Sequence, residues 1–510
     1  MIHIFSHSRI SDTHTASAGQ SLTAVYLFAV FLGLPLAVHR GYFNITEAKY
    51  LFFLFVSGPY VLLTLLLWLC GRRAALPFTP SKALRIADIG MALFVAAFMV
   101  SSLISGEPGT FLGLGARYQG VLSALCYALV YACVSRNFLF SRLSFLGLII
   151  GFCLTCVLAV LNDFGLDPLH MVRALPAEQR WQFISTVGNN NFYSAYLGTL
   201  LPVLLAGWCF ARRRFYQIAC GIALLCGFAG MLPSASESLM LAMLTGLWLL
   251  PLLLMKHPRA LRRLCMALIA MAVTLAGLRL ARLFVPALHF LSFSLRVLSS
   301  PPALIALSLV CGLLLLLLAK REKPIPGQRI YLLVSLGLLA IGAVVIVLCN
   351  TVFAARSFGW LDRFVKLNEN WGTDRGRIWA YCLNAFRSFS PLEMIFGKGP
   401  GFLALYDSQH PIFPDAILDT AHNEYIQYLL TIGIAGLLGY LALLIGTVRA
   451  AYQHAKESPL ALALIVGIVA YAAQAFVNIA QPASTPILFL LLGMAAGSFN
   501  QKNGHAAFLE

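Results

Sequence analysis

The sequence predicts an all-α protein that crosses a membrane many times. Of its 510 residues, 60% are hydrophobic and only 11% are charged, whereas about a quarter of the residues of a typical soluble protein are charged. The mean hydropathy of +0.83 also lies far above that of a soluble chain. The apolar residues gather into runs of about 17 to 25 residues, which is the length a helix needs to cross the hydrocarbon layer.

About 12 to 14 such runs are expected to be transmembrane helices. The first twenty residues, MIHIFSHSRISDTHTASAGQ, lack the layout of a cleavable signal, so the first run is expected to remain as a span. Arg279 and Arg282 interrupt the ninth run, and the runs near 120 and 239 are short. The expected spans lie near 21–38, 50–70, 86–105, 120–135, 143–161, 192–211, 215–232, 239–255, 264–285, 302–319, 330–354, 425–448, 460–477 and 482–499.

The charges in the loops predict the orientation of these spans, because short cytoplasmic loops collect Lys and Arg. With the N-terminus inside, the inner loops carry over half of the 36 basic residues. The short outer loops near 232–238 and 478–481 carry none. The net charge of +17 is therefore explained by topology and by contact with anionic lipid rather than by nucleic-acid binding. The basic residues of the inner loops are Arg72, Arg73, Lys82, Arg85, Arg136, Arg142, Arg212, Arg213, Arg214, Lys256, Arg259, Arg262, Arg263, Lys320, Arg321, Lys323, Arg329, Arg449 and Lys456.

Two long polar segments are then expected on the outer face of the membrane, with both termini in the cytoplasm. One runs from Asp163 to Asn191 and the other from Arg356 to Glu424, and the second holds eight of the 19 acidic residues. The chain thus divides into a bundle of about 11 spans (1–354), a large outer loop (355–424) and about three C-terminal spans (425–510). Long polar loops on a rigid scaffold are frequent places for functional sites.

Cofactor motifs are missing from the sequence. The 12 cysteines do not form an exported disulfide framework, and the histidines lack zinc-site spacing. The sequence also has no phosphate-binding loop and no dinucleotide fingerprint. We therefore expect no metal ion and no cofactor.

The segment TDRGRIWAYCLNAF, residues 373–386, predicts an amphipathic helix that lies at the membrane interface. Arg375 stands four residues before Trp379 and therefore on the same face. Such an arginine can simply extend its head toward water, or it can bind an anion, because a guanidinium matches phosphate oxygens in a forked geometry. Arg377 is a second candidate in the same turn.

The segment STVGNNNFY, which begins at Ser185, precedes the sixth expected span, and Arg180 lies upstream of it. Asn189 and Asn191 are candidates for binding a sugar or phosphate, because amides both donate and accept hydrogen bonds. Consecutive asparagines at the start of a helix can equally cap its free N–H groups, and the cap is the favoured interpretation.

The segment TAHNEYIQYLLTIGIAG, residues 420–436, places three polar side chains before an apolar run. Asp419 or Thr420 is the expected N-cap, which puts His422 in the first helical turn at the positive end of the helix dipole. That environment disfavours imidazolium, so a neutral His422 can act as a general base. Asn423 and Glu424 are expected to assist at the same place, where free N–H groups favour a phosphate.

These segments together resemble the O-antigen ligase and polymerase superfamily. His422-Asn423, nine residues, Gly433, two residues and Gly436 are similar to its H-N-x9-G-x-x-G signature. RGRIW followed by PLEMIFGKGPGF (391–402) resembles its arginine helix and glycine-rich tail. STVGNNN is similar to its GNxN segment, and LGARYQGVL (114–122) resembles a further segment that adds Arg117.

The resemblance implies a metal-independent, inverting glycosyltransferase of the GT-C type that takes a glycan from undecaprenyl diphosphate during cell-surface polysaccharide assembly. By the same resemblance, Arg375 holds the donor diphosphate and His422 activates the acceptor hydroxyl, with Arg117 and Arg180 as weaker donor-site candidates. The segment PSASESLML (233–241) has Glu237 where ligases of the superfamily often have an arginine. Ligase and polymerase activities therefore both stay open, as do the donor sugars and the acceptor.

A transporter or flippase of lipid-linked glycan is the alternative, since many spans and a few intramembrane charges such as Asp88 are also typical of transporters. Transporters usually place their polar residues and broken helices near the midplane. Here the polar residues concentrate in two outer loops, which favours the enzyme. A catalytically dead scaffold would be expected to lack Arg375 or His422, and both are present.

Overall fold

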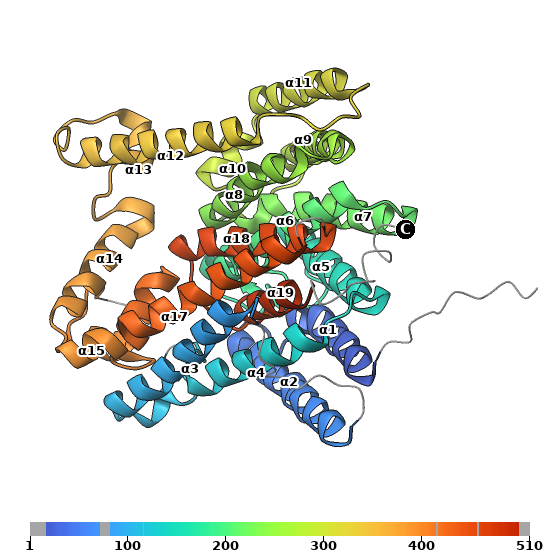
Figure 1. Cartoon of the computed structure of the whole chain (residues 1–510). Coiled ribbons are helices and arrows are strands. Elements are labelled where there is room, and N and C mark those ends of the chain that lie inside the picture. The colour runs from blue at the N-terminus through green and yellow to red at the C-terminus, as the bar shows by residue number, and fades with distance from the viewer. Residues whose placement is uncertain (1–16, 72–81, 116, 415–416, 456–457, 499–510) are drawn as a thin grey trace, which may run out of the picture.

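The protein is a bundle of apolar helices with a helical loop region at one end (Figure 1). The computed structural model describes residues 17–71, 82–115, 117–414, 417–455 and 458–498. Within these ranges, 12 helices are long and apolar enough to cross a membrane. The expected all-α polytopic fold is confirmed. Most of the first twenty residues lie outside the described residues, as do Arg72, Arg73 and Lys456.

The candidate spans follow the expected runs closely. They are α1 (Ala18–Leu36), α2 (Ile45–Leu69), α3 (Arg85–Ser105), α5 (Arg142–Asp163), α6 (Asn190–Phe210), α7 (Arg214–Met231), α8 (Glu237–Leu254), α9 (Pro258–Phe284), α11 (Pro301–Leu318), α12 (Gln328–Asn350), α17 (Glu424–Ala455) and α18 (Pro459–Gln474). Two further apolar helices, α4 (Val121–Asn137) and α19 (Thr485–Gly497), are shorter.

The remaining elements are short and lie mostly in the connecting loops. They are the turns η1 (Pro108–Thr110), η2 (Ala177–Gln182), η3 (Leu232–Ser234), η4 (Gly359–Leu361) and η5 (Ala475–Val477), and the helices α10 (Phe293–Leu298), α13 (Asp362–Val365), α14 (Trp371–Arg387), α15 (Pro391–Phe396) and α16 (Phe402–Gln409). Strands β1 (Phe183–Ile184) and β2 (Gly188–Asn189) pair antiparallel, with Phe183 opposite Asn189.

Burial separates the centre of the bundle from its lipid-facing edge. In α6, 94% of the most apolar window is buried, whereas in α12 only 11% is buried. Helices α11 and α12 accordingly stand at the margin of the bundle (Figure 1). All 13 residues of α19 are buried, so this short helix is enclosed by protein and its backbone ends do not face lipid.

Glycines let the backbones of α3 and α17 approach closely. A Cβ on Gly90 would lie 2.5 Å from the backbone nitrogen of Leu443, and one on Gly439 would lie 2.7 Å from that of Phe94. In a bilayer the hydrophobic effect does not hold helices together, and small residues let the helices pack closely enough for van der Waals contacts to do so. This contact fixes α17, the helix that follows His422, against the N-terminal part of the bundle.

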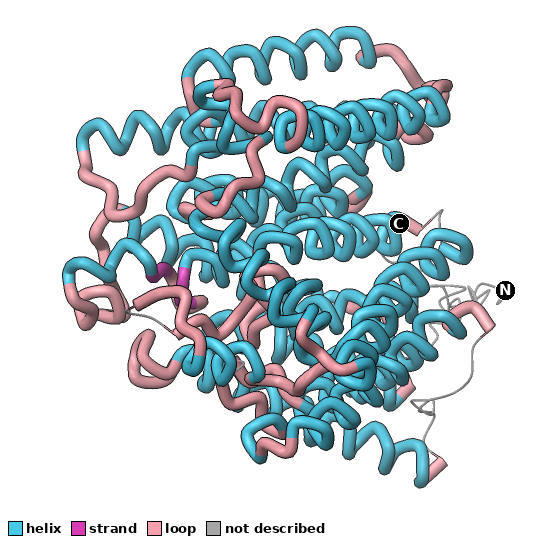
Figure 2. Tube along the Cα trace, turned by 90° about the vertical axis from the view of Figure 1, so that its left-hand side faces the viewer, coloured by secondary structure: helices cyan, strands magenta, loops and turns pink. Residues whose placement is uncertain are grey.

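The long polar segments gather on one face of the bundle, which Figure 2 views directly. Asn478 donates a hydrogen bond to the backbone oxygen of Asn191, at 3.2 Å, and Gln474 donates one to that of Ala195, at 2.9 Å. The C-terminal end of α18 therefore lies beside the N-terminal end of α6 on this face. With 21 residues, α6 is about 30 Å long and separates this face from the opposite one.

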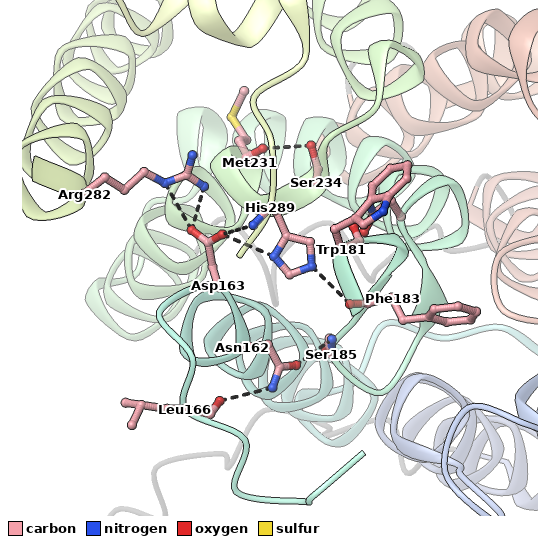
Figure 3. A network of polar contacts seen from close by, with 11 residues as sticks. Asn162, Asp163, Leu166, Trp181, Phe183, Ser185, Met231, Ser234, Arg282 and His289 are labelled. Atoms are coloured by element: carbon pink, nitrogen blue, oxygen red, sulfur yellow. Dashed lines mark hydrogen bonds and ion pairs between the residues drawn. The ribbon is translucent and has the colours of Figure 1, made fainter. Parts of the chain in front are cut away.

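A buried carboxylate explains the arginine that interrupts the ninth run. Arg282, near the C-terminal end of α9, contacts Asp163 at the end of α5 with an N···O distance of 2.6 Å (Figure 3). The other oxygen of Asp163 accepts a hydrogen bond from the backbone N–H of His289 and lies 3.2 Å from its Nδ1, while Nε2 of His289 contacts the carbonyl of Phe183. These contacts join α5, α9 and the β1 strand.

Candidate functional site

His422 precedes α17 rather than lying in its first turn. The N-cap is Asn423, whose side-chain oxygen accepts hydrogen bonds from the backbone N–H groups of Tyr425 and Ile426 at 3.0 and 3.1 Å. The expected cap by Asp419 or Thr420 is wrong. His422 has a left-handed backbone with φ of 47°, a conformation that costs a non-glycine residue energy and that clusters at functional sites.

The glycine signature after His422 marks a break in α17. Gly433 has φ 68° and ψ −170° inside the helix, and a Cβ there would lie 2.3 Å from the carbonyl oxygen of Ile395. The break releases two helix carbonyls, and the FGKG loop binds them: the N–H groups of Lys398 and Gly399 donate to Leu430 and Thr431 at 3.0 and 2.9 Å. The glycine signature after His422 and the glycine-rich FGKG loop therefore form a single contact, in which the loop satisfies the helix carbonyls freed by the break.

The arginine helix α14 contains a backbone reversal before Arg375. Gly372, Thr373 and Asp374 all have φ between 62° and 64°, so the regular part of the helix begins at Arg375. Gly376 has no room for a side chain, because a Cβ would lie 1.9 Å from the carbonyl oxygen of Asn368. The glycine of the RGR pattern is thus required because the preceding loop folds back onto the helix.

The apolar face of α14 packs on a small core of the loop region. Ile378 and Cys382 are buried together with Leu403 and Leu430. The apolar face of this amphipathic helix is thus buried against the loop region and against α17. Nε1 of Trp379 donates a hydrogen bond to the backbone oxygen of Ala421 at 3.1 Å, which ties the arginine helix to the residue before His422.

Arg375 is a cation without a carboxylate partner. Its Nη1 donates to the carbonyl oxygen of Gly372 at 2.5 Å, while its Nε is enclosed and has no hydrogen-bond partner. Across the described part of the chain, no Asp or Glu lies within ion-pair distance of its guanidinium. Burial lowers the pKa of Arg375, but arginine remains charged in proteins. An enclosed, unpaired cation is costly unless an anion joins it.

Arg117 comes from the loop before α4, far away in the sequence. Its guanidinium makes a two-pronged contact with Asp419, at 2.9 and 3.1 Å, and lies over the ring of Phe192 at 5.3 Å. Both Arg117 and Tyr118 have positive φ. This loop packs on the glycine-rich tail, since a Cβ on Gly401 would lie 3.0 Å from the carbonyl oxygen of Leu114.

His422 lies among these charges. Burial lowers the pKa of its imidazole to about 4; the positive charges of Arg375 and Arg117 act in the same direction, and Asp419 opposes them. The site therefore holds a neutral histidine at neutral pH, beside one unpaired arginine and one arginine–aspartate pair. This arrangement can bind an anion and accept a proton.

Two of the other predicted arginines are placed differently. Arg377 is 42% exposed and lies 3.6 Å from Glu369, so it points away from Arg375 on the same helix. Arg180 lies in η2, and its guanidinium donates to the backbone oxygens of Leu175 and Arg173, just before η2, at 3.0 and 3.2 Å. Neither residue contributes to the charge around His422.

The predicted amide and acid residues mostly have structural partners. Asn189 caps α6 by accepting from the N–H of Asn191 at 2.9 Å, and the side chain of Asn191 accepts from Ser236 at 2.8 Å. Glu424 points into the bundle, where Tyr440 and Tyr471 donate to it at 2.6 and 3.0 Å. These contacts favour the capping interpretation for the asparagines and correct the expectation that Glu424 assists at the donor site.

Two residues of the site were not predicted as such. Asp419 was expected only as a helix cap, and Trp379 only as an apolar residue of the arginine helix. Their partners are Arg117 and Ala421, distant in the sequence, so no local pattern shows the contact. Within the described ranges, no three His, Cys, Asp or Glu side chains are grouped so that they could hold a metal ion.

Comparison with known families agrees with this geometry. Residues 286–441 match the family model described as O-antigen ligase. This region, less than a third of the chain, is similar to that family. The region matched to this family contains both Arg375 and His422, whereas Arg117 lies outside it. A search of curated proteins gave no match to the chain.

Proposed function

We propose that the protein transfers a glycan from undecaprenyl diphosphate to an acceptor hydroxyl at the outer face of a bacterial plasma membrane. The observation that carries the proposal is the neutral His422 beside Arg375, a cation that lacks a carboxylate partner. A diphosphate leaving group needs fixed positive charge, and an attacking hydroxyl needs a base. The O-antigen ligase match supports the same reaction class.

The proposed step is a direct displacement without a metal ion. The acceptor oxygen attacks the anomeric carbon while the bond from that carbon to the diphosphate oxygen breaks, which inverts the configuration. The hydroxyl proton passes to a ring nitrogen of His422. The electron pair leaves with the lipid diphosphate, whose growing negative charge Arg375 stabilises.

Donor binding would also tune the base. In the free protein, Arg375 and Arg117 help to keep the pKa of His422 at about 4, which makes it a weak base. A bound diphosphate offsets these positive charges, so the pKa of His422 rises toward its usual range. His422 would therefore become a competent base only when the donor is in place, and Asp419 would stabilise the imidazolium that forms.

The test is transfer by the purified full-length protein in detergent, with an undecaprenyl-diphosphate oligosaccharide and no added metal. A new glycoside together with free lipid diphosphate is the expected product. His422→Ala should lower the rate by about 100-fold to 10,000-fold, which is the range of general-base contributions. If the protein in vesicles instead moves intact lipid-linked glycan across the bilayer, and cleaves it with none of the acceptors, the result would support a transporter.

Two acceptors separate ligase from polymerase. A second lipid-linked repeat unit is the acceptor of a polymerase, and a distinct cell-surface glycan or other anchor is that of a ligase. Arg375, which would hold the donor diphosphate, and His422, which would take the proton of the acceptor hydroxyl, should be required with either acceptor.

A further inference from the structure

A charged cavity of about 590 Å³ lies at the far end of the bundle, where α6 ends and α9 and α18 begin. Its apolar wall includes Phe210, Pro459 and Leu462, and four Lys and Arg side chains are among its other lining residues. Since the opposite end of α6 carries the asparagine loop and the contacts with α18, the length of α6, about 30 Å, separates this cavity from the face that holds His422.

The cations of this cavity outnumber its acids. Arg212, Lys256, Arg259 and Arg263 line it together with a single described acidic residue, Glu322. Arg259 already pairs with Glu322 at 3.0 Å, and Arg262 lies 3.8 Å from the same carboxylate. Three lining cations, Arg212, Lys256 and Arg263, are thus left without an ion pair among the described residues.

Arg263 is held in place with donors to spare. Its Nη1 donates to the backbone oxygens of Cys209 and Ala211, at the C-terminal end of α6. Among the described residues, no oxygen accepts a hydrogen bond from its Nε or Nη2. Arg212 and Lys256, by contrast, are exposed. One anchored and two exposed cations above an apolar wall suit a phosphate attached to a hydrophobic body.

We propose that this cavity binds the phosphate of an anionic phospholipid headgroup. Its position at the end of the spans puts it at the level of lipid headgroups, and basic pockets between transmembrane helices are known to bind such lipids. The apolar wall of Phe210, Pro459 and Leu462 would contact the glycerol and the start of the acyl chains. The site is independent of glycan transfer, since it lies on the other face.

The experiment compares an Arg212→Gln/Lys256→Gln double variant with an Arg85→Gln/Arg329→Gln control. Arg85 and Arg329 are exposed, lie in the first turns of α3 and α12 on the same face, and do not line the cavity, so both variants lose two positive charges. Each purified protein is titrated with phosphatidylglycerol, phosphatidylethanolamine or sodium pyrophosphate, and its thermal stability is measured. Phosphatidylglycerol should stabilise the wild type and the control and bind about 25-fold more weakly to the double variant, at about fivefold for each charge.

The three arms distinguish the source of the phosphate. Stabilisation by phosphatidylglycerol alone supports the lipid site. Stabilisation by pyrophosphate without stabilisation by phosphatidylglycerol, lost in the double variant, would show that a soluble phosphate is the ligand and would overturn the lipid assignment. Equal weakening in the double variant and the control, or equal response to phosphatidylethanolamine, would reduce the effect to general attraction between a basic face and lipid and overturn the proposal.

Discussion

The two long polar segments lie on the same face of the bundle but use their polar groups differently. In the segment that begins at the end of α5, Asp163 is only 2% exposed in its side chain and is paired with Arg282 (Figure 3), and Arg180 donates to carbonyls of its own loop. In the segment before α17, Arg375 is enclosed without a carboxylate and His422 has a strained backbone. A polar loop is thus a candidate site where its hydrogen-bonding and charge capacity is left unused.

Among the variants that test this comparison of the two segments, Arg375→Gln is expected to change transfer the most. Losing one fixed cation at a developing negative charge should lower the turnover number by about 100-fold to 1000-fold. The thermal stability should stay equal or rise, because the variant removes an enclosed cation that has no ion-pair partner. Transfer kinetics and thermal unfolding of the same preparation check both. A clear loss of stability would mean that Arg375 holds the fold, and the comparison of the two segments would fail.

The second effect is that of Asp163→Ala on stability. The substitution leaves Arg282 buried without its carboxylate, at a cost of about 3 to 5 kcal/mol. The unfolding temperature should fall well below that of the wild type, while the transfer rate per folded molecule is kept. The matched control is Glu322→Ala on the opposite face, whose pair with Arg259 is mostly exposed and should cost less than about 1 kcal/mol.

The third effect concerns the break in α17. Gly433→Ala adds a Cβ 2.3 Å from the carbonyl oxygen of Ile395 at a residue with φ of 68°, so the FGKG loop must move and transfer should fall. Gly337→Ala on α12 is the control, because nothing lies within 4 Å of its Cβ position. It should leave transfer unchanged. Equal activity of the two variants would show that the contact between the glycine motifs is not needed.

The smallest effect is expected from Arg180→Gln and Asn191→Ala. Both side chains have protein partners, so we expect transfer within about twofold of the wild type at saturating donor, and stability losses of about 1 kcal/mol. Donor titrations check this. A tenfold increase in the donor KM for either variant would return the asparagine loop to the donor site.

Much of the fold and part of the site could be predicted from the sequence, and the difference has a physical origin. Spans are local, since about 20 apolar residues are enough to define one, and both ends of α6 and the start of α17 were predicted within two residues. The predicted N-cap of α17 was wrong because the carboxylate of Asp419 pairs with Arg117, which lies 302 residues away in the sequence. Pairings of this kind depend on packing that the local sequence does not encode.

Glu424 shows the same limit. Its position beside His422 and Asn423 in the sequence suggested a shared role, but the cap at Asn423 begins the helix there and directs Glu424 toward Tyr440 and Tyr471. Neighbours in the sequence at a helix start can thus face opposite environments. The glycines were predicted only as a signature, and their reason became visible in the contact between Gly433 and the residues around Gly397.

The most direct test of the account is the pH dependence of transfer. A free-protein pKa of about 4 for His422 predicts that kcat/KM for the donor stays constant from neutral pH down to about pH 5 and falls below that, as the imidazole takes up a proton. The acid limb of kcat, which reports the donor complex, should lie at higher pH, because the bound diphosphate raises the pKa of His422. Acid limbs of kcat and kcat/KM at the same pH, or limbs that persist in His422→Ala, would contradict the proposal that His422 is a base held neutral by Arg375 and activated by the donor.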